Sequence, residues 1–225
     1  HIFFELRQHV NPLSRYFQLP LALPLLEDIF EQPSNPLHLD IGSANGKFLI
    51  GLAPLFPEHN FIGLEIRRSL VISSENIRNQ LGIKNLKFLF CNVNVSLEDW
   101  LSTLQNGQLS IVSIQFPDPW FKKKHYKRRV VQVSLIQTIG RYLTEGGQIF
   151  LQTDLYNIIN YMDNIIQSTG LFDLNLQAKE KLINYNPFPI KTEREIYVVK
   201  QGLPVYRSLY YRNDKPIVNN SSCIG

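Results

Sequence analysis

Short, continuous apolar runs alternate with longer segments in which apolar residues recur at helical spacing. The apolar runs predict five buried strands, at 37–41, 61–66, 86–91, 109–116 and 147–154. The longer segments predict helices at 47–56, 69–81, 97–104, 130–143 and 156–167. Because strands and helices alternate at βαβ spacing, we expect an α/β fold with a mostly parallel, doubly wound sheet.

The pattern changes near the C-terminus, where REIYVVK (194–200) and VYRSLYYR (205–212) are both strand-like and meet near Gly202. No long helix separates them, so we expect a C-terminal antiparallel hairpin that closes the sheet. Internal repeats and linker-like segments are absent from the sequence. We therefore predict one α/β domain over residues 36–212, preceded by an extension over 1–35 and followed by a tail over 213–225.

The amino-acid composition excludes several classes of protein. In 225 residues, 44% are hydrophobic and 19% are charged, which excludes a disordered or fibrous chain. Two cysteines, Cys91 and Cys223, are too few for a disulfide scaffold or a four-cysteine zinc site. The histidines are scattered without metal-ligand spacing, so we predict no metal.

No apolar run reaches the roughly 20 residues of a membrane helix, and no secretory signal is present, so we expect no membrane association and a cytoplasmic location. Met162 is the only methionine, so we expect further residues before His1.

Polar residues follow the first three predicted strands. Asp40 and Gly42 lie in LDIGSANGKF (39–48), Glu65 ends the second strand, and Asn92 follows the third. The carboxyl ends of parallel strands share one edge of the sheet, where ligands bind. The fingerprint G-x-G-x-x-G is absent, which favours a cofactor without a pyrophosphate. Glu65 is placed to accept hydrogen bonds from ribose hydroxyls, and the Asn92 amide to contact an adenine edge. A strand-end glycine turn is also common in α/β proteins that bind no cofactor.

The fourth strand runs into FPDPWFKKKHYKRR (116–129). Pro117 and Pro119 restrict the backbone around Asp118, so its carboxylate projects from the strand end with little freedom. Trp120 and Phe121 offer flat faces for an unstacked base. The octamer at 122–129 holds six basic side chains, and without them the formal net charge of +4 would become −2. Such a concentrated patch suits a phosphate-rich partner, although proline turns and basic loops also occur without function.

Two further motifs allow two interpretations each. Asp154 follows the fifth strand, either at the same edge as Asp118 or as the N-cap of the next helix. Thr192 and Glu195 have the spacing of a capping box, which would mark the start of a helix. The strand-like IYVV that follows them argues against a helix at this place.

The string FPDPWFKKKHYKRR resembles the signature of the bacterial tRNA (guanine-N7)-methyltransferases, and RQHVNPL (7–13) resembles their N-terminal segment. The likeness spans roughly residues 7–212 and includes DIG, LEIR, CNV, TD and T-x-x-E in the family's order. It implies a Rossmann-like fold dependent on S-adenosylmethionine, and a product with 7-methylguanosine in the variable loop of tRNA.

The resemblance also implies roles for individual residues. Asp118 matches the position of catalytic importance beside the cofactor. Further cofactor positions are matched by Asp40, Gly42, Glu65 and Asn92, and tRNA-substrate positions by Lys122, Asp154, Thr192 and Glu195. In this sequence Asp40, Ala44 and Asn92 stand where many members have Glu, Gly and Asp.

Two other functions stay open at this point. One is a methyltransferase of the same fold that acts on another RNA or on a protein amine. The other is a catalytically idle RNA-binding subunit, against which the clustered carboxylates beside a basic patch argue. We expect a monomer or homodimer without an obligate partner subunit.

Overall fold

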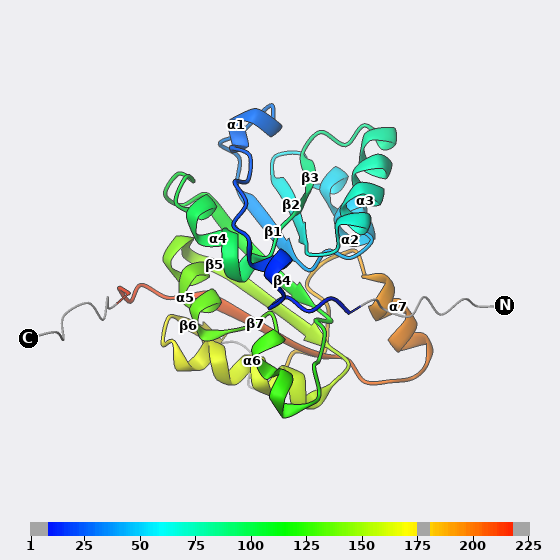
Figure 1. Cartoon of the computed structure of the whole chain (residues 1–225), viewed down its shortest axis with the longest axis vertical. Coiled ribbons are helices and arrows are strands. Elements are labelled where there is room, and N and C mark those ends of the chain that lie inside the picture. The colour runs from blue at the N-terminus through cyan, green and yellow to red at the C-terminus, as the bar shows by residue number, and fades with distance from the viewer. Residues whose placement is uncertain (1–8, 175–180, 218–225) are drawn as a thin grey trace, which may run out of the picture.

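The computed structural model describes residues 9–174 and 181–217, so parts of the predicted extension and tail lie outside the described residues. The described residues form a seven-stranded sheet in the order β3-β2-β1-β4-β5-β7-β6 (Figure 1). Its parallel strands are β1 (Leu37–Ile41), β2 (Asn60–Glu65), β3 (Leu86–Phe90), β4 (Leu109–Gln115) and β5 (Leu143–Thr153). The short β6 (Phe172–Leu174) and β7 (Tyr206–Arg212) are antiparallel, with β7 between β5 and β6. The predicted doubly wound α/β fold is confirmed.

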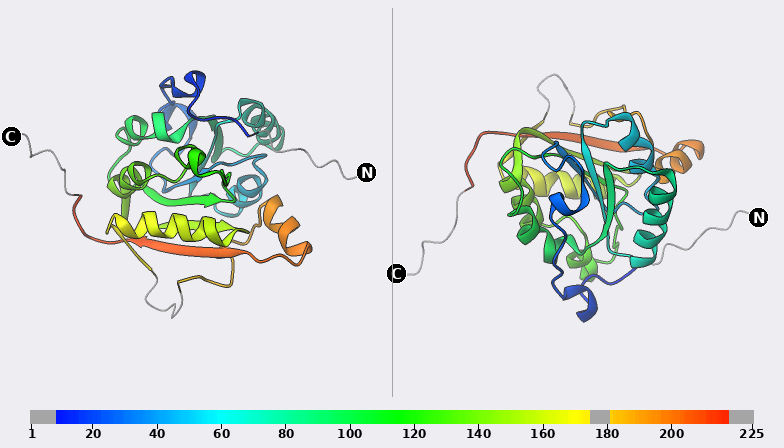
Figure 2. Two further views of the ribbon diagram at one scale, coloured as in Figure 1. Left: turned by 60° about the horizontal axis from the view of Figure 1, so that its bottom comes forward. Right: turned by 90° about the horizontal axis from the view of Figure 1, so that it is seen from above.

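Helices cover both faces of the sheet (Figure 2). On one side lie α4 (Val93–Leu101), α5 (Val133–Tyr142) and α6 (Tyr156–Ser168), which contribute to the larger apolar core. On the other lie α2 (Lys47–Leu52), extended by the 3₁₀ turn η2 (Ala53–Leu55), and α3 (Arg68–Leu81), which form a smaller core. The predicted strands and helices of 37–167 are all present with shifted ends. For example, α4 begins at Val93 rather than 97 because Asn92 caps it.

Successive side chains of strand β1 point alternately into the two apolar cores on the two faces of the sheet. Leu37, Leu39 and Ile41 point into the larger core. His38 points the other way, against the rings of Phe61 and Phe188. As expected for a packed core histidine, His38 is 2% exposed, and burial lowers its pKa to about 3.

The predicted strand at 194–200 is wrong, because these residues form helix α7 (Glu193–Lys200). Thr192 caps the helix by accepting a hydrogen bond from the Glu195 amide at 3.1 Å, and acidic residues occupy the first turn. Buried Glu195 and Val198 are three residues apart, whereas Ile196 and Val199 are exposed. The antiparallel C-terminal pairing is present. However, β7 pairs with β5 and with β6, and not with residues 194–200 as the expected hairpin required.

The described part of the extension packs against the sheet domain. It contains the 3₁₀ turn η1 (Arg15–Gln18) and the short helix α1 (Leu26–Ile29). Leu26 and Phe30 are buried in the larger core. Trp100 Nε1 donates to the Pro24 carbonyl at 2.7 Å, and the Leu21 amide donates to Ser96 Oγ at 3.0 Å. These contacts hold the segment along α4. Among the described residues, no helix has the length and apolar character needed to cross a membrane.

Candidate active site

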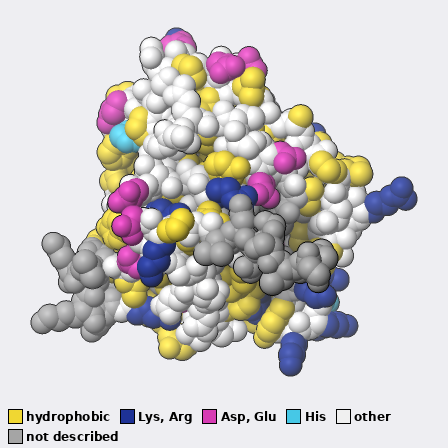
Figure 3. All heavy atoms as spheres, turned by 90° about the vertical axis from the view of Figure 1, so that its left-hand side faces the viewer, with side chains coloured by type: hydrophobic (Ala, Val, Ile, Leu, Met, Phe, Trp, Pro, Cys, Tyr) yellow, Lys and Arg dark blue, Asp and Glu magenta, His cyan; other side chains and the backbone are white. Residues whose placement is uncertain are grey.

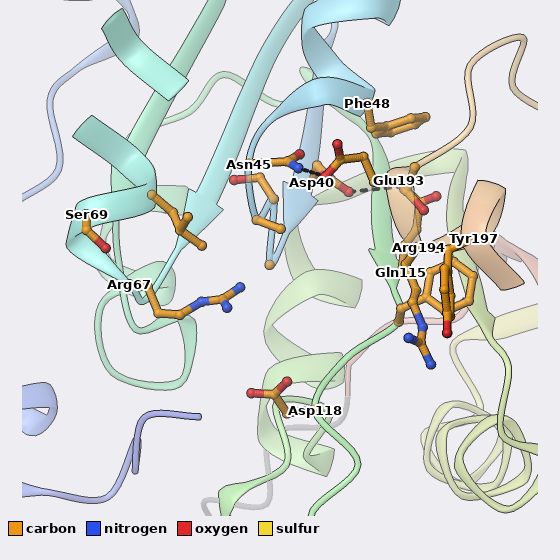
Figure 4. Close-up of a pocket in the computed structure, with 16 residues that line it drawn as sticks. Asp40, Asn45, Phe48, Arg67, Ser69, Gln115, Asp118, Glu193, Arg194 and Tyr197 are labelled. Carbon is orange, nitrogen blue, oxygen red and sulfur yellow. Dashed lines mark hydrogen bonds between the residues drawn. The ribbon is translucent and has the colours of Figure 1, made fainter. Parts of the chain in front are cut away.

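Two adjoining pockets open at the carboxyl ends of the parallel strands. The larger, of about 530 Å³, extends towards α7, and the smaller, of about 120 Å³, lies between β2, β3 and the N-terminal segment. Both pockets are lined by Gly42, Arg67, Gln115, Phe116 and Asp118. In Figure 4, side chains of α7 form the side of the larger pocket opposite Arg67 and Ser69. Of the strand-end residues predicted from the sequence, Asp40, Glu65, Asn92 and Asp118 line one or both of these adjoining pockets, whereas Asp154 lines neither.

The turn after β1 depends on its backbone conformation. Gly42, Ala44 and Gly46 all have positive φ, at 78°, 51° and 78°. At Gly46 a Cβ would lie 2.6 Å from the Phe88 ring, so only glycine fits there. At Gly42 a Cβ would meet open space, so the conformation alone favours glycine. Gly42 lines both pockets, and because it has no side chain the turn leaves room there for a ligand.

Asp40 lies beneath this turn and is 3% exposed. Its Oδ1 accepts hydrogen bonds from Ser113 Oγ at 2.7 Å and Gln115 Nε2 at 3.4 Å. Burial raises the pKa of Asp40 to about 7; these two bonds oppose the rise, and the charge of Glu65 adds to it. A cation in the larger pocket would favour the ionised form of this carboxyl.

Glu65 ends β2 with its carboxylate held in a fixed orientation. Its Oε1 accepts a hydrogen bond from the Ala44 amide at 3.1 Å, and its Oε2 from the Arg67 amide at 2.9 Å. The Arg67 guanidinium also pairs with it, with Nη2 at 3.1 Å from Oε1. Arg67 Nε also donates to Oε2, at 3.3 Å, so four hydrogen bonds fill the roughly four acceptor sites of the carboxylate, and a ligand hydroxyl would have to displace the Arg67 guanidinium.

Asn92 lies where the sequence predicts, but its amide is used within the protein. Its Nδ2 donates to the carbonyls of Pro12 at 3.2 Å and Phe17 at 3.0 Å, and its Oδ1 accepts from the Asn94 amide. Asn92 thus anchors the N-terminal segment, whose Val10 and Pro12 line the smaller pocket. The sequence did not identify these two residues, and the match of 7–13 to the family was the one signal that pointed to the segment.

Asp118 lies on the wall that the two pockets share, with a side chain 34% exposed. It is flanked by Phe116 and Trp120, which have positive φ of 49° and 44°, so the loop is held in a conformation rare for such residues. His9 Nδ1 lies 3.1 Å from Asp118 Oδ2, and the centres of the His9 and Trp120 rings are 5.8 Å apart. The expectation that Asp118 projects from the strand end with little freedom agrees with this geometry.

The basic octamer divides into two groups. Its four lysines are exposed, on and beside the 3₁₀ helix η3 (Lys123–Arg128). Its arginines support the loop instead. Arg129 is 5% exposed, donates to the Pro119 carbonyl at 2.8 Å and lies 3.8 Å from the Tyr126 ring centre. Arg128 lies over Trp120 at 5.1 Å, so the indole is covered, whereas Phe121 is 63% exposed.

Asp154 does not cap α6, whose N-cap is Leu155 without a side-chain hydrogen bond. Instead, Asp154 Oδ2 pairs with Arg194 Nη2 at 2.7 Å, which joins the end of β5 to α7. The carboxyl ends of β4 and β5 are neighbours in the sheet, so Asp154 shares the edge with Asp118. Of the two interpretations of Asp154, the structure favours the edge position.

Glu195 is fully buried and does not face a pocket opening. It pairs with Arg207 Nη2 at 2.8 Å and accepts from Asn186 Nδ2 at 2.8 Å and Gln152 Nε2 at 3.2 Å. The preceding acid, Glu193, pairs with Asn45 (Figure 4) and with Lys47, and these contacts join α7 to the start of α2. The α7 residues at the larger pocket, above all Arg194 and Tyr197, were missed because this segment was predicted to be a strand.

Comparisons with known proteins agree with this architecture. A family model described as "Putative methyltransferase" matches residues 34–208. Among solved structures, an aminoglycoside resistance methyltransferase has a TM-score of 0.53 at 15% identity, covering 83% of this chain and 90% of that one. A putative rRNA-methylase from Clostridium thermocellum has a TM-score of 0.53 at 9% identity, with coverages of 80% and 88%. These structural likenesses show the Rossmann-like methyltransferase fold.

Sequence relatives identify the family. A tRNA (guanine-N(7)-)-methyltransferase of Prochlorococcus marinus (strain MIT 9313) is 54% identical over 210 residues, 93% of this chain and 89% of that protein. One from strain NATL2A is 51% identical over 214 residues, 95% of this chain and 100% of that protein. Within the described residues, no cluster of three or more His, Cys, Asp or Glu is arranged to hold a metal. Identity at this level over nearly the whole of both chains means that this protein belongs to the tRNA (guanine-N(7)-)-methyltransferase family.

Proposed function

We propose that this protein transfers the methyl group of S-adenosyl-L-methionine to N7 of a guanine in tRNA, and that the guanine lies in the variable loop. Its relatives, about half identical over almost the whole chain, are tRNA (guanine-N(7)-)-methyltransferases. The observation that carries the proposal is the placement of Asp118, on the wall between two pockets and directly before the exposed lysines of residues 122–127.

The donor set of the pockets fits S-adenosyl-L-methionine, a cation with two ribose hydroxyls and an α-ammonium group. Three carboxylates, Asp40, Glu65 and Asp118, face the two pockets. Ser43 Oγ is buried at the larger pocket and has no hydrogen-bond partner among the described residues. We assign Glu65 to the ribose, Asp118 to the wall beside the reacting centre, and Asp40, Gly42 and Asn92 to the remaining cofactor contacts.

The chemistry needs orientation more than proton transfer. When bound, S-adenosyl-L-methionine supplies an electrophilic methyl group on a sulfonium. Guanine N7 carries an in-plane lone pair and no proton, so no general base is required. In that transfer the N7–carbon bond would form as the carbon–sulfur bond breaks, which would leave the bonding pair on sulfur and the positive charge on the purine. Asp118 orients the base and offsets this charge.

The tRNA backbone is held by exposed lysines next to this site. Lys122 is the first of them and occupies the N-cap position of η3 without a side-chain capping bond, so its ammonium group can reach a phosphate beside the target base. Asp154 contacts the substrate from the neighbouring strand. Thr192 and Glu195 act less directly, because Thr192 caps α7 and buried Glu195 fixes its position. We further propose a cytoplasmic monomer or homodimer that needs no partner subunit.

The test is methyl transfer from labelled S-adenosyl-L-methionine to unmodified bulk tRNA, followed by mass analysis of the nucleosides. Label in 7-methylguanosine is the expected result. Label in another nucleoside would contradict the base assignment. Cofactor binding without transfer would point to another substrate or a missing partner, and absence of cofactor binding would favour an idle RNA-binding subunit.

The variant Asp118→Ala should separate the role of this carboxylate from binding. We expect it to fold and to bind tRNA as the wild type does, but to lose at least about 100-fold in the rate of methyl transfer, since electrostatic groups at a reacting centre contribute this much. Turnover close to that of the wild type would refute the mechanism.

A further inference from the structure

A row of buried polar side chains crosses one face of the sheet, from the larger pocket to β7. It begins with Asp40 and Gln115, which both line that pocket (Figure 4). Gln115 on β4 lies opposite Gln152 on β5, which in turn lies opposite Arg207 on β7. Asp40 on β1 lies opposite Ser113, two residues before Gln115, so all of these side chains share one face. Because a buried polar group is costly without a partner, the members of the row need hydrogen bonds to one another.

The hydrogen bonds of this row run in one direction, which the charged pair at its far end fixes. A guanidinium can only donate, so the Gln152 atom that lies 3.1 Å from Arg207 Nε is the amide oxygen. The amide nitrogen of Gln152 then faces the Glu195 carboxylate at 3.2 Å and Gln115 at 2.7 Å. Gln115 accepts this bond through Oε1, so its own Nε2 faces Asp40 Oδ1, at 3.4 Å. The donor that Asp40 receives is therefore determined three strands away, on β7.

The charge of Asp40 depends on a balance between opposing groups. Its Oδ1 accepts a second bond from Ser113 Oγ at 2.7 Å, and because Ser113 has one hydroxyl hydrogen, it accepts in turn from His38 Nε2 at 2.8 Å. The bonds from Ser113 and Gln115 favour the ionised carboxylate, whereas burial and the charge of Glu65 favour the protonated form. The other charged side chains that line the same pocket are Arg67, Asp118, Glu193 and Arg194. Loss of either donor should therefore raise the pKa of Asp40.

We propose that the two glutamines form a relay through which the buried Arg207–Glu195 pair keeps Asp40 anionic for the cationic cofactor. Gln152 is not among the described residues that line either pocket, so it is a positioning residue that acts through Gln115. Without the Gln152 amide, Gln115 can turn over and present Oε1 to Asp40, which favours a protonated carboxyl that donates. The inference rests on the proposed function, which places S-adenosyl-L-methionine at Asp40, and adds how the charge at that place is maintained.

The test is the pH dependence of S-adenosyl-L-methionine binding without tRNA, measured by isothermal titration calorimetry. The affinity of the wild type should rise with pH around neutrality, because the cofactor binds the ionised carboxylate and burial raises the pKa of Asp40 to about 7. Gln152→Met keeps the length of the side chain but has no amide. We expect it to move the midpoint of this rise up by about half a pH unit or more, which is about a threefold loss of affinity below the midpoint and little loss well above it. The titration of the ligand itself is common to all variants, so differences between variants report the protein.

Gln108→Met is the matched control, because Gln108 is also buried and hydrogen-bonded but directly precedes β4, at the opposite edge of the sheet from Asp40. Its midpoint should equal that of the wild type. If Gln152→Met does not fold, Gln152→Asn replaces it, since an amide one carbon shorter does not span from Gln115 to Arg207, and its midpoint should also move up. An unchanged midpoint in the folded Gln152 variant, or an equal shift in Gln108→Met, would overturn the relay. Failure of the wild type to bind S-adenosyl-L-methionine at any pH would instead refute the proposed function.

Discussion

Asp40 shows how position changes the chemistry of a single side chain. It is surrounded by the sheet and accepts two hydrogen bonds, from Ser113 and Gln115. Even so, burial raises its pKa to about 7, well above the ordinary value of 3.8 for aspartate. Such a carboxyl changes charge near neutral pH. His38, which shares the Ser113 hydroxyl at 2.8 Å, stays neutral in that range because burial lowers its pKa.

The variant Asp40→Asn should therefore become more stable relative to the wild type as pH rises from 5 to 8. In this window the folded wild type loses a proton from Asp40 that the unfolded chain has already lost, so its stability falls as pH approaches 7. The difference in free energy of unfolding should grow by about 2–3 kcal/mol, measured by urea denaturation. The exposed Asp99→Asn should track the wild type. Parallel curves for Asp40→Asn and the wild type would contradict the raised pKa.

At the scale of elements, α7 is the segment where local pattern and tertiary context disagree. The run Ile196–Val199 is rich in residues that favour strands. The N-cap at Thr192, together with the buried pair of Glu195 and Arg207, nevertheless favours a helix. That helix carries Glu193 and Arg194 to the rim of the larger pocket. A correct helix assignment is thus a condition for finding this side of the site.

Two substitutions of the same kind on α7 should differ in their effect on stability. Glu195→Gln leaves Arg207 with a buried, uncompensated charge, and we expect a loss of at least about 2 kcal/mol. Glu193→Gln removes an exposed pair with Lys47, for which the loss should stay below about 1 kcal/mol. Denaturation curves of the two variants provide the measurement. Equal losses would mean that the buried pair does not hold α7 in place.

At the scale of the molecule, charge is distributed unevenly. In Figure 3 several lysine and arginine side chains gather at the lower right, where no acidic side chain is visible, while the acidic side chains lie in the upper part, at the left and near the centre. The chain without residues 122–129 would have a net charge of −2. The four lysines of that segment are exposed next to Asp118, because β4 leads directly into the loop that carries them. The fold therefore places the positive surface beside the pockets.

Replacing Lys122, Lys123 and Lys124 with Gln should flatten the dependence of tRNA affinity on salt. Each phosphate contact that is lost lowers the slope of log K against log salt by about 0.7–0.9, so three contacts would lower it by about 2. Filter binding at several salt concentrations measures the slope. Lys84→Gln is the control, because this 75% exposed lysine precedes β3 at the opposite edge of the sheet. An unchanged slope in the triple variant would place the tRNA contact elsewhere.

The sequence by itself determined the parallel sheet, the strand-end positions of Asp40, Glu65, Asn92 and Asp118, and the family. These features follow from local periodicity and contiguous motifs, which neighbouring residues specify. Only the tertiary structure decided that 194–200 is a helix, that Glu195 is buried against Arg207, that Asp154 pairs with Arg194, and that Val10 and Pro12 border the smaller pocket. Each of these depends on contacts between residues distant in the chain, which can override local propensity and leave no periodic trace in the sequence.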